Sequence, residues 1–295
     1  MDIRVLKYFL TVAREESITK AADALHMTQP PLSRQMKELE QELGKQLLIR
    51  GSKKVTLTED GLLLRKRAEE MVSLYEKTMT EMTASDRQVA GDIYFGAGET
   101  EGISIVADYA KKLQDRYPLI HFHLVSGDAF HISERLDNGL SDFGLFLGSV
   151  DSSKYESIKL PCKDTWGLLM PSDSPLAEKE TIRPKDLKKL PLIVSQQTIT
   201  DGALNTWLKQ DISSLNIVIT YDLVYNASRF VKSGFGYAVA LDGIINTEGD
   251  SGLAFRPLSP RLEINMYIVW KRKQIFSKAS ACFLKVLQED FEDTF

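Results

Sequence analysis

The sequence predicts an α plus α/β chain, in which one long helix joins a small helical module to a larger α/β domain. Three patterns in its 295 residues support this prediction. Residues 1–58 carry apolar side chains at helical spacing and then two short apolar segments, residues 59–90 carry one apolar seam, and residues 91–295 alternate short strands with helices. We therefore expect three consecutive regions with these boundaries.

The composition is that of an ordinary globular protein, with 43% hydrophobic and 26% charged residues. No apolar run is long enough to cross a bilayer, and the N-terminus lacks the order of a signal peptide. We expect a cytoplasmic protein with no membrane partner. Cys162 and Cys282 lie far apart in apolar stretches, and two packed apolar residues are favoured over a redox switch.

The net charge of -4 is unevenly distributed along the chain. Residues 1–58 carry 10 Lys and Arg against 7 Asp and Glu, a balance of +3. Residues 91–295 carry 22 against 27, a balance of -5. A basic first region followed by an acidic body is typical of a modular protein that binds nucleic acid.

The first region reads as three helices. Apolar residues spaced by three and four predict a helix from Ile3 to Arg14 and a shorter one around residues 18–25, which Ser17 or Thr19 could cap. A third helix begins after Met27 and ends at Gly44. Three short helices in this order resemble a helix-turn-helix.

The polar face of the third helix is its informative feature. Its members can donate hydrogen bonds or carry positive charge near the N-terminal end, and they are Gln29, Pro30, Ser33, Arg34 and Lys37, preceded by Thr28. A recognition helix meets base edges and phosphates with such a face. For an isolated polar stripe, a plain solvated surface would be the better interpretation.

Two short apolar segments follow, at residues 47–50 and 55–58, joined by a basic turn. This pattern predicts a hairpin of the winged helix-turn-helix type. Arg50, Lys53 and Lys54 would then lie against a phosphate backbone.

The stretch from Ser17 to Gln35, with Ala21-Ala22, Thr28-Gln29-Pro30-Pro31 and Ser33-Arg34, resembles the signature of the LysR family of transcriptional regulators. The similarity continues through residues 39–44, 47–50 and 56–61. It implies that Thr28, Gln29, Ser33, Arg34 and Lys37 touch DNA, while Arg50 and the hairpin lysines hold phosphates.

From Thr58 to about Ser85 the chain reads as one helix. Its apolar seam consists of Leu64, Ala68, Met71, Tyr75 and Met82, with a polar interruption at Thr78. The chain's own C-terminal domain could cover the seam, but the family resemblance favours the same helix of a second copy. A homodimer implies a dyad-like site on double-stranded DNA, and the resemblance further implies assembly into homotetramers.

The region after Gly91 predicts parallel α/β units. We expect strands at residues 93–97, 120–125, 143–147, 166–170, 192–194, 217–221, 237–241 and 265–270, with helices at 103–113, at 130–138 and from Asn226. The order resembles the LysR effector domain, which implies two lobes of the periplasmic-binding-protein type. Lobe I would comprise residues 91–161 and 268–295 and lobe II residues 162–267, with crossings near Cys162 and Met266.

A ligand in such a fold lies between the lobes, where strands end and helices begin. The candidate residues are Thr100, Ser126, Gln196 and Thr198, although each could instead be a helix cap or turn residue. Free N–H groups at helix starts favour an anion or carboxylate. No phosphate-binding loop, nucleophile elbow or zinc-ligand spacing is found, so we expect no cofactor, metal or catalytic residue. His121 and His123 lack a convincing third ligand.

These observations predict a DNA-binding transcriptional regulator of the LysR type, whose oligomer geometry a small metabolite controls. Two alternatives remain at this point. A two-lobed enzyme or binding protein with an incidental helical module would show no DNA affinity. An architectural protein with a vestigial cleft would bind DNA without responding to any metabolite.

Overall fold

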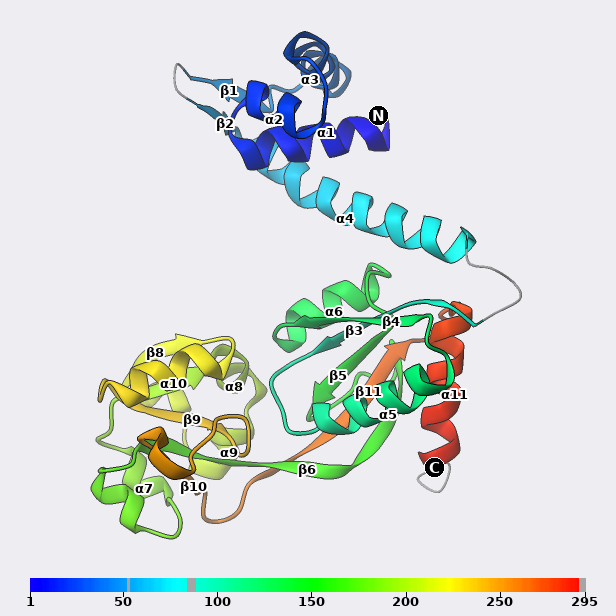
Figure 1. The fold of residues 1–295 in the computed structure, drawn as a ribbon. Coiled ribbons are helices and arrows are strands. Elements are labelled where there is room, and N and C mark those ends of the chain that lie inside the picture. The colour runs from blue at the N-terminus through cyan, green and yellow to red at the C-terminus, as the bar shows by residue number, and fades with distance from the viewer. Residues whose placement is uncertain (52–53, 84–88, 292–295) are drawn as a thin grey trace. The chain divides into compact units, whose positions relative to one another are not determined.

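The computed structural model describes residues 1–51, 54–83 and 89–291 (Figure 1). They divide into two compact units, Met1–Ala84 and Ser85–Phe295. Lys53 and the expected helix end near Ser85 lie outside the described residues.

The N-terminal unit is a helix-turn-helix with a hairpin and a long helix. Its elements are α1 (Ile3–Glu15), α2 (Ile18–Ala24), α3 (Gln29–Leu43), β1 (Leu48–Arg50), β2 (Val55–Leu57) and α4 (Glu59–Thr83). Helices α1 to α3 pack around Phe9, Val12, Leu32 and Met36, none of which is more than 1% exposed. The apolar spacing read from the sequence therefore forms a single small core.

Local polar contacts fix where these helices start and stop. The Ser17 hydroxyl accepts a hydrogen bond from the Lys20 amide and begins α2. Gly44 ends α3 at φ +63°, in the left-handed region that glycine adopts without strain. One carboxylate oxygen of Glu40 accepts from the amides of both Leu47 and Leu48, at 2.8 and 3.0 Å. Glu40 thus fastens β1 to α3.

Helix α4 starts directly after the hairpin and lies along α1. The Thr58 hydroxyl accepts from the Gly61 amide at 2.9 Å, and Lys7 of α1 pairs with Glu76 of α4 at 2.7 Å. The sequence analysis placed Leu64 in the dimer seam, but Leu64 packs against the core of the N-terminal unit. Farther along, Tyr75 is 42% and Met82 79% exposed, so this part of the seam is open.

The C-terminal unit alternates strands and helices. Its strands are β3 (Gly91–Ala97), β4 (Ile120–Ser126), β5 (Phe143–Leu147), β6 (Tyr155–Pro171), β7 (Leu192–Ser195), β8 (Ile217–Tyr221), β9 (Tyr237–Leu241), β10 (Leu253–Pro257) and β11 (Glu263–Lys271). Its helices are α5 (Ile103–Arg116), α6 (Ala129–Asp137), α7 (Pro184–Leu187), α8 (Gln196–Asp201), α9 (Ala203–Leu208), α10 (Val224–Lys232) and α11 (Lys278–Phe291).

Two long antiparallel strands, β6 and β11, run from one lobe into the other (Figure 1). Their pairing shifts register between Asn265 and Tyr267, beside Met266. On one side lie β3, β4 and β5, which are parallel to one another, and on the other side β7, β8 and β9, which are also parallel. The expected fold class, including two α/β lobes, is confirmed.

Each lobe has its own apolar core. In lobe I, Phe95, Phe143 and Phe283 pack together with ring centroids 5.3 to 6.3 Å apart, and Phe283 comes from α11. In lobe II, fully buried Leu168 and Val194 pack with the helices α7 and α9. The C-terminal helix therefore completes the first lobe rather than the second.

The structure adds elements that the sequence analysis did not predict. Strand β6 begins at Tyr155 instead of Trp166, and β10 and α11 were not expected. Helix α10 begins at Val224, two residues before Asn226, because Val224 already belongs to its buried face. No helix of the described residues is long and apolar enough to span a membrane.

Candidate functional sites

Helix α3 presents one buried and one exposed face. Leu32, Met36 and Leu39 are at most 2% exposed. The predicted DNA-contact residues occupy the other side: Thr28, Gln29, Pro30, Arg34 and Lys37 are exposed, and Ser33 is half-buried. The hydrogen-bonding groups near the start of α3 are therefore available to a partner.

Arg34 is the most prominent cation on this face. Its side chain is 81% exposed, and its Nε donates to a carboxylate oxygen of Glu38 one turn later, at 2.8 Å. An exposed ion pair of this spacing contributes only about 0.3–0.5 kcal/mol. The pair orients the guanidinium, yet it is weak enough for Arg34 to exchange Glu38 for a phosphate or a base edge.

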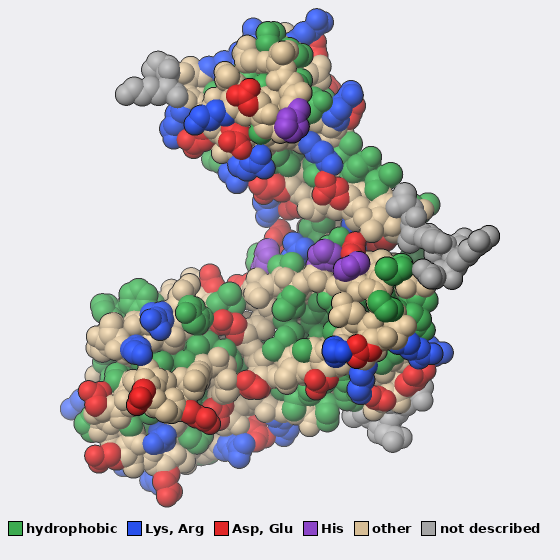
Figure 2. All heavy atoms as spheres, viewed as in Figure 1, with side chains coloured by type: hydrophobic (Ala, Val, Ile, Leu, Met, Phe, Trp, Pro, Cys, Tyr) green, Lys and Arg blue, Asp and Glu red, His purple; other side chains and the backbone are tan. Residues whose placement is uncertain are grey.

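The hairpin of β1 and β2 adds further positive charge. Arg50 is exposed at the end of β1, opposite Val55. Lys54 is exposed and lies 3.2 Å from a carboxylate oxygen of Glu16, while the Val55 amide donates to the Glu16 carbonyl. Figure 2 shows Lys and Arg side chains spread over the visible face of this unit, interleaved with Asp and Glu.

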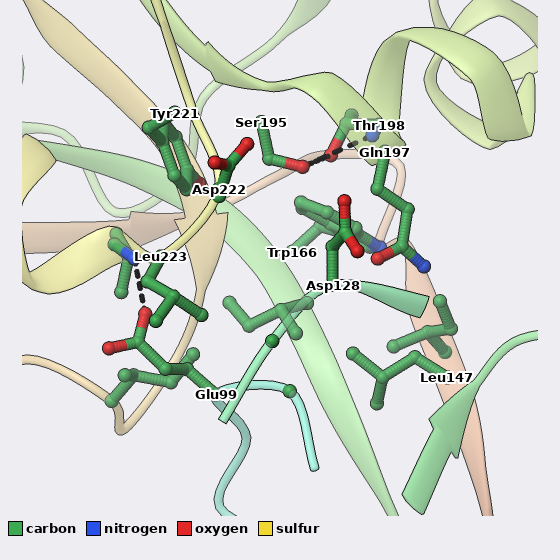
Figure 3. A pocket seen from close by; sticks show the side chains of 16 residues that line it. Glu99, Asp128, Leu147, Trp166, Ser195, Gln197, Thr198, Tyr221, Asp222 and Leu223 are labelled. Atoms are coloured by element: carbon green, nitrogen blue, oxygen red, sulfur yellow. Dashed lines mark hydrogen bonds between the residues drawn. The ribbon is translucent and has the colours of Figure 1, made fainter. Parts of the chain in front are cut away.

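A pocket lies between the two lobes of the C-terminal unit (Figure 3). Its cavity volume is about 70 Å³, and it is partly open to solvent. Lobe I supplies Glu99 and Asp128, and lobe II supplies Ser195, Thr198 and Asp222. Apolar side chains from both lobes, including Leu147 and Leu241, complete the lining.

Three helices begin at this pocket, and protein groups already cap all three. Glu99 accepts a hydrogen bond from the Val224 amide at the start of α10. Asp128 accepts from the His131 amide in α6 at 2.8 Å, and the Ser195 hydroxyl accepts from the Thr198 amide in α8 at 3.1 Å. At each of these helix starts, one backbone N–H that could meet an anion is therefore already bound by a side chain of the protein.

Glu99 also links the lobes, because it follows β3 in lobe I while Val224 belongs to lobe II. The Tyr221 hydroxyl donates to the Val239 carbonyl at 2.8 Å. Burial and the Glu99 carboxylate raise the pKa of Tyr221 above its ordinary value. Tyr221 therefore remains a neutral donor beside Glu99.

Of the four predicted effector residues, the structure places only Thr198 in the lining of this pocket. Thr100 is 4% exposed, and its hydroxyl contacts Asp164 and the sulfur of Met266 instead. Ser126 and Gln196 are exposed and do not line the pocket. The residues that follow them, Gly127, Asp128 and Gln197, line it instead. The strand ends and helix starts that the sequence singled out therefore do meet at this pocket, but residues next to the predicted ones mostly form its lining.

A second cavity adjoins this pocket, and Trp166, Gln197 and Thr198 line both. It also includes Lys154 and Asn265. The indole N–H of Trp166 is buried and has no hydrogen-bond partner among the described residues. A buried unpaired donor costs about 1–3 kcal/mol, so an acceptor in this place would be favoured.

Comparison with known protein families finds a match to each of the two units of the chain. Residues 3–62 match the family described as "Bacterial regulatory helix-turn-helix protein, lysR family". Residues 86–292 match the "LysR substrate binding domain". The chain belongs to the LysR family. It is therefore a DNA-binding transcriptional regulator of the LysR type with an effector-binding domain, as the sequence signature indicated.

Curated relatives of this LysR regulator are themselves transcriptional regulators. HTH-type transcriptional regulator BsdA of Bacillus subtilis (strain 168) is 30% identical over 247 residues, which cover 81% of this chain and 83% of BsdA. A probable RuBisCO transcriptional regulator of Synechocystis sp. is 28% identical over 298 residues, covering 98% of this chain and 86% of the relative.

Solved structures share the whole fold of this LysR regulator. CbnR, a LysR family transcriptional regulator, superposes with a TM-score of 0.77 at 18% identity, covering 99% of each chain. Full-length CbnR complexed with its target DNA superposes with a TM-score of 0.74 at 19% identity, covering 98% of this chain and 99% of CbnR. At these identities the likeness shows the fold alone.

In this LysR regulator, sequence reasoning missed Glu99, Asp128, Gln197, Trp166 and Asp222 as pocket residues. For four of them a signal was present, because Glu99, Asp128, Gln197 and Asp222 each follow a strand end by a few residues. Trp166 gave no such signal, since it lies within β6. Only the crossing of β6 between the lobes brings it to the pocket.

Proposed function

We propose that this LysR regulator binds a dyad-like DNA site as a homodimer or a tetramer, and that a small molecule between its lobes changes the geometry of that assembly. The exposed face of α3 carries the proposal. Thr28, Gln29, Pro30, Ser33, Arg34 and Lys37 contact the major groove, and Arg50, Lys53 and Lys54 of the hairpin region contact phosphates.

CbnR supports the DNA part of the proposal, because that protein is known in a complex with its target DNA and shares the fold over the full length. The open part of the α4 seam supports dimerisation. Tyr75 and Met82 lie on it, and a second copy of α4 would cover them. Two α3 helices would then address two half-sites of a dyad.

The pocket between the lobes supports the effector part. Glu99 of lobe I binds the start of α10 in lobe II, so a ligand that touches Glu99 or Asp222 acts on both lobes at once. A ligand shifts an equilibrium by the difference in its affinity for two arrangements. The regulator needs no covalent chemistry for this, and we propose that it is not an enzyme.

The place of action follows from the partner. A regulator of bacterial type that binds genomic DNA works in the compartment that holds the DNA, so we propose a cytoplasmic location. An architectural protein with a vestigial cleft would share this location and the DNA affinity. It differs in one respect, because its DNA complex would be the same with and without any metabolite.

The DNA interface is tested by salt-dependent binding of the full-length protein to DNA from its own upstream region. Arg34→Ala is compared with Lys285→Ala, since both remove the cation of an exposed i,i+4 ion pair and Lys285 lies on α11, far along the chain. We expect Arg34→Ala to weaken specific binding about 5- to 150-fold if Arg34 contacts a base. If it contacts only phosphate, the slope of log affinity against log salt falls by about 0.9 per contact.

The control variant Lys285→Ala should bind like the wild type in both the specific and the random fragment. An equal loss of affinity for upstream DNA in Arg34→Ala and Lys285→Ala would contradict the proposal that α3 contacts DNA bases. The DNA part of the proposal would also fail if neither the wild type nor Arg34→Ala distinguished upstream DNA from random DNA in a search across the neighbouring intergenic regions.

A further inference from the structure

We propose that the pocket between the lobes recognises a small compound with a protonated amine and a hydrogen-bond acceptor, of net charge zero or positive. Amino acids, amino amides and amino alcohols have this chemistry. The inference rests on the proposed role of the pocket as the effector site and specifies its ligand, in place of the anion or carboxylate that helix starts alone suggested.

The charge of the lining is the first argument. Glu99 and Asp128 of lobe I and Asp222 of lobe II bring three carboxylates to one pocket, and no Lys or Arg is among the described residues that line it. Asp222 is exposed and makes no hydrogen bond or ion pair with any described residue. Three acidic groups repel a free carboxylate, whereas hydrogen bonds from an ammonium group to a carboxylate are among the strongest in proteins.

The helix starts do not offset this charge. Glu99, Asp128 and Ser195 already accept from the first turns of α10, α6 and α8. At α10 or α6 an anionic ligand would have to displace an internal carboxylate and leave it in an acidic pocket, and at α8 it would have to compete with the Ser195 hydroxyl. An amine avoids this, because a carboxylate that accepts from a backbone amide still has lone pairs for an ammonium group.

Trp166 supplies the second, independent observation. The residue is 9% exposed and lines the pocket, and its indole N–H lacks a hydrogen-bond partner among the described residues. Figure 3 shows its ring among Asp128, Gln197 and Thr198. Indole can only donate, so its complement in a ligand is an oxygen or another acceptor.

These two requirements together define the ligand class. An ammonium group faces the carboxylates, and an acceptor faces Trp166. The hydroxyl groups of Ser195 and Thr198 lie 3.0 Å apart beside them and can serve either group. A simple carboxylate satisfies only Trp166, and a simple alkylamine satisfies only the carboxylates.

The test uses the full-length protein and a defined panel of probes. The panel contains the twenty L-amino acids and their amides, the matching 2-hydroxy acids and 2-hydroxy amides, and two amines without a neutral acceptor, ethylamine and putrescine. Thermal melting ranks the probes, and titration calorimetry measures the dissociation constant of the best one. We expect the best probe to be an amine with an acceptor, and its hydroxy counterpart to bind at least tenfold more weakly.

Three variants assign the contacts. Asp222→Asn should weaken the best probe by about 10-fold or more while leaving the unliganded melting temperature near that of the wild type, since Asp222 is exposed. Trp166→Phe should weaken it about 5- to 10-fold by removing the donor. Asp108→Asn, an exposed carboxylate on α5 outside both cavities, is the matched control and should bind like the wild type.

Three results would overturn the proposal: a 2-hydroxy acid that binds as well as its amino acid, an unchanged affinity in Asp222→Asn, or no binding by any amine of the panel. DNA binding by the same preparations separates this from the wider proposal. Specific, Arg34-dependent DNA binding with a 2-hydroxy acid as the best probe refutes the ligand class alone, whereas the absence of specific DNA binding refutes the wider proposal.

Discussion

Replacing Glu40 by Ala should release the hairpin from helix α3. One carboxylate oxygen of Glu40 accepts from the amides of Leu47 and Leu48 at 2.8 and 3.0 Å, and both leucines are 2% exposed. A hydrogen bond to a charged group contributes about 1.5–3 kcal/mol. Because Glu40 is half-buried, we take the lower end for each bond and expect Glu40→Ala to lower the free energy of unfolding by about 3 kcal/mol.

Calorimetry of the full-length protein checks this value. One kcal/mol shifts the melting temperature of a domain of 60–100 residues by about 4–8 °C, so the transition of the N-terminal unit should fall by about 12–24 °C. Operator DNA identifies this transition, because bound DNA raises its melting temperature. Glu40→Gln keeps an acceptor oxygen and loses only the charge, and it should cost about a third as much.

Glu40→Ala should also bind DNA more weakly than the wild type, since Arg50 and Lys54 depend on the hairpin for their position. A Glu40→Ala protein that melts within about 2 °C of the wild type would refute the reasoning. It would mean that water replaces the carboxylate at both amides at no cost.

Three further predictions concern stability, pH and assembly. In Gly61→Ala, the new Cβ would lie 2.2 Å from the Leu47 carbonyl oxygen, so it should destabilise the N-terminal unit by more than about 2 kcal/mol. Gly44→Ala, with φ +63° but open space, should cost only about 1 kcal/mol in the same melting experiment, and equal costs would contradict the close approach. Burial raises the pKa of Asp164 above 3.8, against the hydrogen bond from Thr100, which lowers it. The neutral Asp164 carboxyl group therefore contributes stability that is fully present below the ordinary pKa of an aspartate. This contribution is lost as the pH rises through the raised pKa of the folded state. Urea unfolding followed by tryptophan fluorescence should show a smaller loss of stability between pH 4 and pH 7 in Asp164→Asn than in the wild type, and parallel curves would refute it. Met82→Glu should convert the proposed dimer into a monomer in sedimentation equilibrium, because Met82 is 79% exposed in the single chain and the change would place a charge in the open part of the seam; an unchanged mass would show that Met82 lies outside the interface.

The exposed face of α3 could be predicted from the sequence because it depends on local spacing. Leu32, Met36 and Leu39 repeat at helical steps, and once they are buried, the side on which Arg34 and Lys37 lie is fixed. The two-lobed fold followed from the alternation of strands and helices together with the family signature. Its fold class needed no long-range information.

The pocket could be predicted only to within a residue or two. Strand ends meet at one edge of a sheet, so the neighbourhoods of Thr100, Ser126 and Gln196 were identified. The side chains that point inward depend on contacts between distant segments. Glu99 caps a helix that begins 125 residues later, and no local pattern near Asn226 reveals that partner. The long crossing of β6, which brings Trp166 inward, likewise depends on its pairing with β11.

The last helix gives the chain an order of maturation. Helix α11 (Lys278–Phe291) supplies Phe283, which packs against Phe95 and Phe143 from the beginning of the same lobe. Lobe I cannot close its core until the ribosome has synthesised α11, whereas every element of the N-terminal unit is complete by residue 84. At about 5–20 residues per second, the interval is on the order of 10 to 40 s. Each newly made molecule can therefore fold its helix-turn-helix unit before the first lobe of its effector-binding domain is complete.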